Sequence, residues 1–169
     1  MITEVLKGDL LDFFDQGLFD GIAHGCNCFC NMGSGIAPQI ADRYPNVRLM
    51  DDETEVGDIL KLGGFTVALK DVDFEEKQEM PKVIYNAYTQ YSYGKGKHVE
   101  YSAIANCFKG MNQTGKNFIE TFMPGSDRFV LGIPQIGAGL GGGDWDLITE
   151  IIQRTTPDID VIVVEWDKK

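Results

Sequence analysis

The sequence predicts an α/β fold in which helices cover both faces of one sheet. Short apolar runs that are typical of strands alternate with segments whose apolar residues recur at helical spacing. Two glycine loops, 33–35 and 137–143, each follow an expected strand and precede an expected helix. A chain of 169 residues with 43% hydrophobic content has the length and the apolar content of a single domain of ordinary size.

The expected strands are short runs rich in β-branched and aromatic residues. They are residues 2–6, 21–25, 59–62, 65–69, 82–87, 129–136 and 161–164. The pair Gly63-Gly64 is a two-residue hairpin signal between the third and fourth runs. The acidic segment 46–56 is poorly patterned, and the acidic segment 71–79 is expected to be a solvated loop.

The expected helices are recognised by apolar residues three and four positions apart. They cover residues 11–14, 36–44, 101–111, 118–122 and 147–152. For the second, Ser34 is expected to cap the first turn, Pro38 is tolerated there, and Pro45 ends the helix. Asp144 can cap the last helix.

The charge of the chain restricts its partners. A net charge of −11 argues against nucleic acid or an anionic membrane as the main partner, because phosphate contacts need clustered Lys and Arg. The sequence has no apolar run long enough to cross a membrane and no secretory signal at its start. A cytoplasmic protein is expected, or one in the host cytoplasm if the source is viral.

Three of the four cysteines form a C-x-C-x-C run, Cys26, Cys28 and Cys30, after His24. An extended backbone would place these side chains on one face, which raises the hypothesis of a metal site. Zinc sites space their cysteines differently and add a second ligand pair, which the remaining His98 and Cys107 do not form. We therefore expect free thiols and no metal.

The two glycine loops are expected to face one crevice, because ligands of open α/β sheets lie beyond the carboxyl ends of the strands. Two sets of free N–H groups in one place suit a diphosphate. The competing interpretation is a dinucleotide fingerprint at 137–142, with Glu165 at the end of the next strand. That motif comes too late in the chain for a Rossmann half, and Pro134 is awkward in a central strand.

The segment 24–45, HGCNCFCNMGSGIAPQIADRYP, resembles a macro domain. Gly8-Asp9 before it and PQIGAGLG at 134–141 after it occur in the matching order. The resemblance is strongest to the branch of ADP-ribose 1″-phosphate phosphatases and ADP-ribosyl-glutamate hydrolases. It implies one three-layer α/β/α domain over residues 1–169, around a mixed, mostly parallel sheet of about six strands.

The resemblance also implies binding roles. Asp9 and the backbone of Leu10 would hold the adenine, although Asp9 can equally cap a helix. Asn27 would hold the distal ribose, or serve only in a turn. Trp166 or a tyrosine of residues 88–93 is a candidate for stacking on a ring. The two loops would wrap the distal ribose and the phosphates through Gly33, Ser34, Gly35, Ile36, Gly137, Ala138, Gly139, Leu140 and Gly141.

The candidate catalytic residues are His24, Asn27 and Asp144. Histidine suits acid–base work near neutral pH, but His24 can also be a hydrogen-bonded residue at a strand end. Asp144 can orient water or only cap a helix. The glutamate hydrolases use a lysine where this chain has Thr89 or Gln90, and an aspartate where it has Gly141. This departure argues against their mechanism unless Lys95 or Lys97 folds inward.

Together these features predict a monomeric protein that binds ADP-ribose and hydrolyses ADP-ribose 1″-phosphate without a metal or other cofactor. A binding module without catalysis is one alternative. Removal of ADP-ribose from modified macromolecules is a second, and an NAD-binding protein is a third. No membrane partner and no direct contact with nucleic acid are expected.

Overall fold

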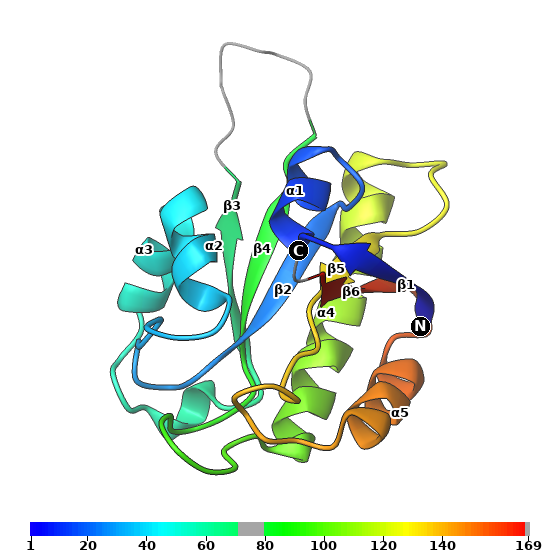
Figure 1. Ribbon diagram of the computed structural model, residues 1–169. Helices are drawn as coiled ribbons and strands as arrows, with labels where there is room; N and C mark the ends of the chain where they lie inside the picture. The colour runs from blue at the N-terminus through cyan, green and yellow to red at the C-terminus, as the bar shows by residue number, and fades with distance from the viewer. Residues whose placement is uncertain (71–79, 168–169) are drawn as a thin grey trace.

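The computed structural model describes residues 1–70 and 80–167 (Figure 1). The acidic segment 71–79, expected to be a loop, lies outside the described residues. The elements are β1 (Ile2–Gly8), α1 (Leu10–Asp15), β2 (Gly21–Cys26), α2 (Ala37–Arg43), α3 (Asn46–Asp52), η1 (Ile59–Lys61), β3 (Phe65–Leu69), β4 (Val83–Tyr88), α4 (Tyr101–Phe122), β5 (Val130–Ile133), α5 (Trp145–Thr155) and β6 (Asp160–Trp166).

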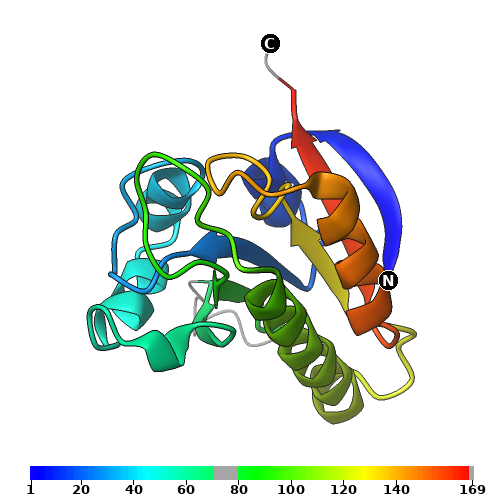
Figure 2. The same cartoon turned by 90° about the horizontal axis from the view of Figure 1, so that it is seen from below.

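One six-stranded sheet forms the centre of the molecule, with the strand order β1-β6-β5-β2-β4-β3. Every neighbouring pair is parallel except β3 with β4, which is antiparallel. The sheet is therefore mixed and mostly parallel, as the sequence predicts. The carboxyl ends of five strands lie along one edge, and Figure 2 shows the loops that gather there.

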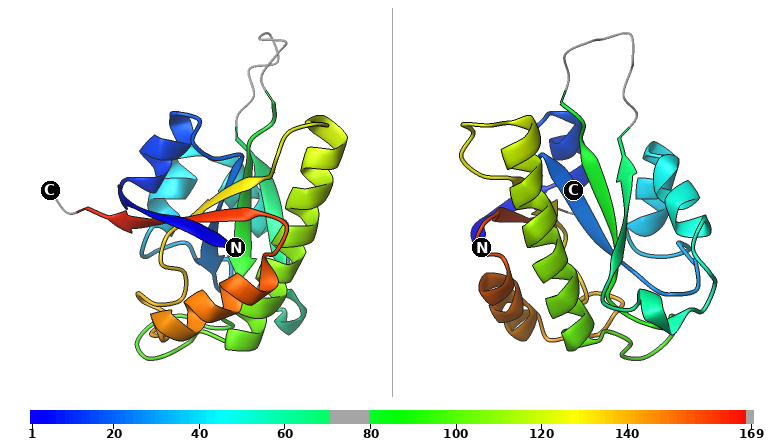
Figure 3. Two further views of the ribbon diagram at one scale, coloured as in Figure 1. Left: turned by 90° about the vertical axis from the view of Figure 1, so that its right-hand side faces the viewer. Right: turned by 180° about the vertical axis from the view of Figure 1, so that it is seen from behind.

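Helices cover both faces of this sheet, which makes three layers (Figure 3). Helices α4 and α5 pack on one face around Ile104, Phe108 and Ile148. Helices α1, α2 and α3 pack on the other face through a second cluster that includes Phe14 and Ile40. Covering both faces explains why β4 is buried along its whole length.

Residues 46–64 contain a helix that the sequence pattern does not predict, and two expectations for them are wrong. The segment 46–56 contains α3, whose pattern is weak because its buried positions are one apolar residue, Val47, and one carboxylate, Asp51. The expected strand 59–62 is the short 3₁₀ helix η1, whose first turn is capped by Asp58. The glycine pair does not close a hairpin. It leads the chain into β3, and the Gly63 N–H donates to the carbonyl of Tyr88.

Three smaller differences concern element ends. The strand expected to run from 129 to 136 ends at Ile133, so Pro134 lies outside the ladder. The helices expected at 101–111 and 118–122 are one helix, α4, because Gly115 packs closely in its interior. Ser34 does not cap α2, which begins after Ile36 without a side-chain cap. No helix in the described part of the chain is long and apolar enough to span a membrane.

We predict that Gly115→Ala destabilises the fold even though alanine is the better helix former. A Cβ there would lie 2.9 Å from Ile159 Cγ2 and 3.0 Å from the Phe129 ring. Overpacking costs about 1–3 kcal/mol, against a gain of roughly 1 kcal/mol in helix propensity. Urea unfolding should show a lower free energy of unfolding, whereas the exposed neighbour Lys116→Ala should stay within about 0.5 kcal/mol of wild type.

Candidate functional site

The carboxyl end of β2 is the floor of the candidate site. Gly25 is exposed, although every other residue of this strand is buried. A Cβ at this position would lie 2.9 Å from Thr89 Oγ1 and 3.4 Å from Ile136 Cγ2, so there is no space for a side chain. A glycine inside a strand marks a place where another group approaches the backbone closely. The sheet is therefore open to a ligand at its centre.

The two glycine loops meet beside this floor. The Leu140 side chain lies 3.6 Å from the position that a Cβ on Gly35 would take. The structure thus places the loop after β2 against the loop after β5, as the sequence predicts. In the described part of the chain, no acceptor is found for the N–H groups of Ser34, Gly35, Ile36, Gly139, Leu140 and Gly141. Such donors suit an anionic ligand.

The second loop is held in shape by its own backbone and by the segment before α4. Gly143 N–H donates to the Gly137 carbonyl over 2.8 Å, and the N–H groups of His98 and Val99 donate to the Gly141 carbonyl. Gly137 has φ +77°, a conformation that favours glycine. The carbonyls of Gly137 and Gly141 are thus used inside the protein. The N–H groups of the loop that have no acceptor stay available for the crevice.

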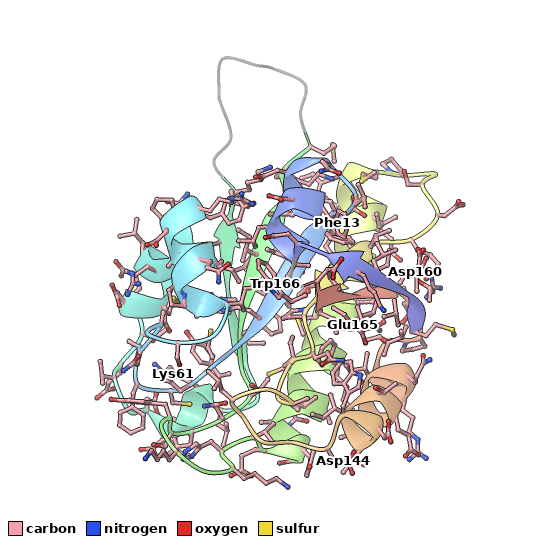
Figure 4. All side chains as sticks on the ribbon, in the orientation of Figure 1. Phe13, Lys61, Asp144, Asp160, Glu165 and Trp166 are labelled. Atoms are coloured by element: carbon pink, nitrogen blue, oxygen red, sulfur yellow. The ribbon has the colours of Figure 1, made fainter. Side chains whose placement is uncertain are left out.

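The residues expected to bind adenine gather where β1 and β6 end. Asp9 caps α1 through Oδ1, which accepts from the N–H groups of Leu11 and Asp12. Its Oδ2 accepts no hydrogen bond from the described residues, so the carboxylate has an oxygen for a ligand. Gly8 pairs with the exposed Trp166, and the Phe13 ring covers Gly8 (Figure 4). Phe13 carries no sequence signal of its own for this site, because its position depends on the missing side chain of Gly8.

Asn27 holds its own loop. Its Nδ2 donates to the Asn31 carbonyl over 2.8 Å, and its Oδ1 accepts from the Phe29 N–H over 2.9 Å. The side chain is 8% exposed. The turn role considered for this residue is thus present in the structure, and contact with a ribose stays a prediction.

His24 is not placed for catalysis, which corrects the role expected for it. The side chain is fully buried on the face that α1, α2 and α3 cover, and Nε2 lies 2.7 Å from Asn86 Oδ1. Because Asn86 Nδ2 donates to Val47 and Thr66, its Oδ1 is the acceptor and His24 Nε2 carries the proton. Burial lowers the pKa of His24 to about 4. A neutral imidazole without solvent access contacts no substrate.

A chain of polar contacts continues from this histidine towards the loop of Asn27. Beyond Asn86 and Thr66, the Tyr88 hydroxyl donates to Asp51 Oδ1 over 2.7 Å. Burial raises the pKa of the Asp51 carboxyl. The chain ends where Lys61 Nζ donates to Thr54 Oγ1 over 2.7 Å, with Cys30 Sγ at 3.5 Å. This network holds the first loop at Cys30, whose thiol contacts Asp51, Thr54 and Lys61.

Cys26, Cys28 and Cys30 lie in this region, whereas Cys107 lies on α4 in the core of the other face, and all four are free thiols. Cys30, Asp51 and Asp52 bring three potential ligand atoms within 4.8 Å of one another. The ammonium of Lys61, next to Cys30, already supplies positive charge there. The geometry therefore gives no specific support for a metal ion among the described residues.

Asp144 is exposed and caps the N-terminus of α5, which is one of the two roles expected for it. Its Oδ1 accepts from the N–H groups of Asp146 and Leu147, and its own N–H donates to the Tyr101 hydroxyl over 3.0 Å. Hydrogen bonds from this N–H and from Lys97 lower the pKa of Tyr101. Asp144 Oδ2 accepts nothing from the described residues and is the carboxylate oxygen that stays available beside the second loop.

The two positions at which the resemblance implies a lysine are occupied by Thr89 and Gln90. Thr89 is 1% exposed, and its hydroxyl has no hydrogen-bond partner among the described residues. Gln90 Oε1 lies 3.3 Å from the place of a Cβ on Gly141, so Gln90 abuts the second loop. Neither side chain supplies a nucleophilic amine to the crevice.

A separate cavity of about 520 Å³ lies at the opposite, amino-terminal edge of the sheet. Lys116 and Arg128 line it together with Glu120, Asp127 and Asp158. Mixed charge of this kind does not suit a polyanion. The carboxyl edge, with its unpaired N–H groups, is the better candidate for an anion.

Known proteins resemble this chain in sequence and in fold. No family model matches the chain. A 17.5 kDa protein of Enterobacteria phage T4, from the tk-vs intergenic region and itself uncharacterised, is 36% identical over 99% of this chain and 98% of its own length. An ADP-ribose 1″-phosphate phosphatase of Debaryomyces hansenii is 26% identical over 97% of this chain and 100% of its own.

Solved structures show the same fold. The macrodomain of Thermus aquaticus DarG has a TM-score of 0.69 at 18% identity, with 97% of each chain covered. A Trypanosoma brucei macrodomain, solved in complex with ADP-ribose, has a TM-score of 0.60 at 13% identity. That match covers 95% of this chain and 62% of the other. The three-layer arrangement is therefore that of these macrodomains.

We predict that neutral, buried His24 makes stability depend on pH. The pKa is about 4 in the folded protein and near 6.5 in the unfolded chain. As pH falls through this window the unfolded chain binds a proton that the folded protein does not. The contribution of neutral His24 to the free energy of unfolding is thus fully present above pH 6.5 and is lost towards pH 4. Between pH 7.5 and 5 the loss is about 2 kcal/mol.

Urea unfolding at several pH values measures this loss. In His24→Gln, whose Nε2 keeps a donor near the place of the imidazole Nε2 for Asn86 Oδ1, this part of the pH dependence should disappear. A variant whose stability falls with pH as steeply as that of wild type would contradict the assignment.

Proposed function

The chain belongs to the macrodomain family, and from this premise we propose that it binds ADP-ribose and hydrolyses ADP-ribose 1″-phosphate to ADP-ribose and phosphate. One observation carries the proposal. Two glycine loops with unpaired N–H groups meet beside the exposed Gly25 at the centre of the sheet. The name of the Debaryomyces hansenii relative supports the reaction, and the ADP-ribose complex of the Trypanosoma brucei macrodomain supports the ligand.

The proposed binding mode divides the ligand between three places. The adenine lies by Asp9 and Trp166, where Asp9 Oδ2 accepts a hydrogen bond from the adenine amino group. The diphosphate lies against the N–H groups of the second loop. The distal ribose lies by the loop of Asn27. This order follows the carboxyl edge of the sheet from β1 and β6 to β2, as Figure 2 shows.

The proposed reaction adds water across the phosphate ester of the distal ribose. Backbone N–H groups stabilise the charge that develops on the phosphoryl oxygens, which is the largest single contribution in many enzymes. Asp144 Oδ2 is the carboxylate oxygen available to orient the water. His24 takes no part, because it has no access to the crevice.

A second candidate is a binding module without catalysis. The observation in its favour is that His24 is buried and that Asn27 uses its side chain inside its own loop. Binding with no release of phosphate would establish this candidate and refute the hydrolase. Neither Thr89 nor Gln90 provides the lysine of the glutamate hydrolases, so removal of ADP-ribose from protein glutamate is not favoured.

We predict that ADP-ribose binds more tightly than NAD or AMP, and that Asp9→Ser weakens it about tenfold. Serine keeps the cap of α1 but is too short to reach the adenine, whereas Asp9→Ala would also lose the cap. Calorimetric titration measures both affinities. Tighter binding of NAD, unaffected by Asp9→Ser, would instead support the dinucleotide fingerprint.

We also predict that Gly139→Val abolishes phosphate release without unfolding the protein. A Cβ at Gly139 meets nothing within 4 Å, so the fold accommodates it, but the added side chain takes the space of a ligand held against the loop. The measurement is phosphate release from ADP-ribose 1″-phosphate, together with the melting temperature. The exposed, remote Ser126→Val should behave like wild type. Full activity in Gly139→Val would place the ligand elsewhere.

A further inference from the structure

A strap of residues 89–99 forms the third side of the crevice. The strap leaves the sheet at Thr89 and returns to start α4, and its two ends are joined by the bridge between Gln90 and Val99. Figure 2 shows this segment next to both glycine loops. Its tip is the sequence Gly94-Lys95-Gly96, with φ +104° and +106° at the two glycines.

The strap packs on the first loop through its first half. The Cys28 N–H donates to the Tyr91 carbonyl over 3.0 Å. The Phe29 ring lies edge-on to Tyr91 and Tyr93, with centroids 5.0 and 6.1 Å apart. Cys28 directly follows Asn27, so this half of the strap borders the place proposed for the distal ribose.

The second half of the strap packs on the second loop. Lys97 lies so near Gly142 that a Cβ there would be 3.3 Å from Lys97 Cα. Lys97 Nζ donates to the Tyr101 hydroxyl over 3.1 Å, and the same hydroxyl accepts from the Asp144 N–H. Lys97 is therefore engaged in joining the strap to the loop and to α4.

Lys95 is the cation of the strap that is not engaged. Its carbonyl accepts from His98 Nε2 over 3.1 Å, which closes the tip of the strap. Its ammonium makes no ion pair or hydrogen bond with any residue of 1–70 or 80–167. No heavy atom of the described residues outside the local chain lies within 4 Å of a Cβ on either flanking glycine. The tip has room to move towards a ligand.

The charge of the substrate needs such a cation. A phosphate monoester on the distal ribose adds up to two negative charges to those of the diphosphate, and the protein already carries −11. The N–H groups of the second loop serve the diphosphate. In the proposed binding mode the monoester is attached to the distal ribose, by the loop of Asn27, which the strap contacts through Tyr91.

We propose that Lys95 is a specificity-determining residue, whose ammonium pairs with the phosphate monoester and distinguishes ADP-ribose 1″-phosphate from ADP-ribose. This inference rests on the proposed function, because the monoester is placed by the binding mode given above. Lys97 holds the strap against the second loop, and Lys95 forms the ion pair with the phosphate monoester. A charge-assisted pair of this kind forms with the phosphorylated ligand alone.

The test compares Lys95→Gln with Lys109→Gln, an exposed lysine of α4 outside the crevice whose loss changes the net charge equally. For each variant, calorimetry gives Kd for ADP-ribose, and phosphate release gives kcat/KM for ADP-ribose 1″-phosphate. Lys95→Gln should lower kcat/KM about tenfold at low salt and leave Kd for ADP-ribose within about twofold. Lys109→Gln should change neither, and Lys95→Arg should retain most of the activity.

Each other outcome is decisive. An equal loss for both ligands, or no loss for either, would overturn the role of Lys95 and leave the proposed function intact. If wild type binds ADP-ribose but releases no phosphate, the same comparison is made with Kd for the two ligands. If wild type binds neither ligand, the proposed function fails first, and the role of Lys95 fails with it.

Discussion

The pairing of β2 between β4 and β5 is the interaction on which the site depends. Parallel pairing brings the carboxyl ends of the three strands to one edge, so the three segments that follow them must meet. Gly25 leaves the end of the central strand uncovered, and Thr89 and Ile136 from the two neighbours close in on either side. The crevice is thus a consequence of strand order, and the loops supply its chemistry.

An acidic protein that binds an anion must do so with short-range donors. The long-range field of a chain with net charge −11 opposes a nucleotide. Backbone N–H groups act over hydrogen-bond distances and carry no net charge, so many of them can gather without mutual repulsion of the kind that lysines experience. A single unengaged lysine at the tip of the strap then adds selectivity where the ligand carries an additional phosphate.

The buried network under α3 shows why residue roles are harder to predict than loops. His24, at the end of an expected strand, has the sequence context of a catalytic histidine. Its partner Asn86 is 62 residues away, and Asn86 is in turn held by Val47 and Thr66. Whether an imidazole is a base or a packed core residue depends on burial and on such distant partners. The sequence around His24 indicates neither its burial nor its distant partners. Helix α3, which covers His24, was itself not predicted.

The sequence by itself determined the layered α/β class, the strand runs that pack in both cores, and the two glycine loops, because hydrophobic periodicity and glycine positions are local properties. It also indicated the family through motifs in those loops. The tertiary structure decided which face each side chain occupies. It buried His24 against Asn86 and brought the strap of residues 89–99 against both loops. These depend on contacts between segments far apart in the chain, which no local pattern records.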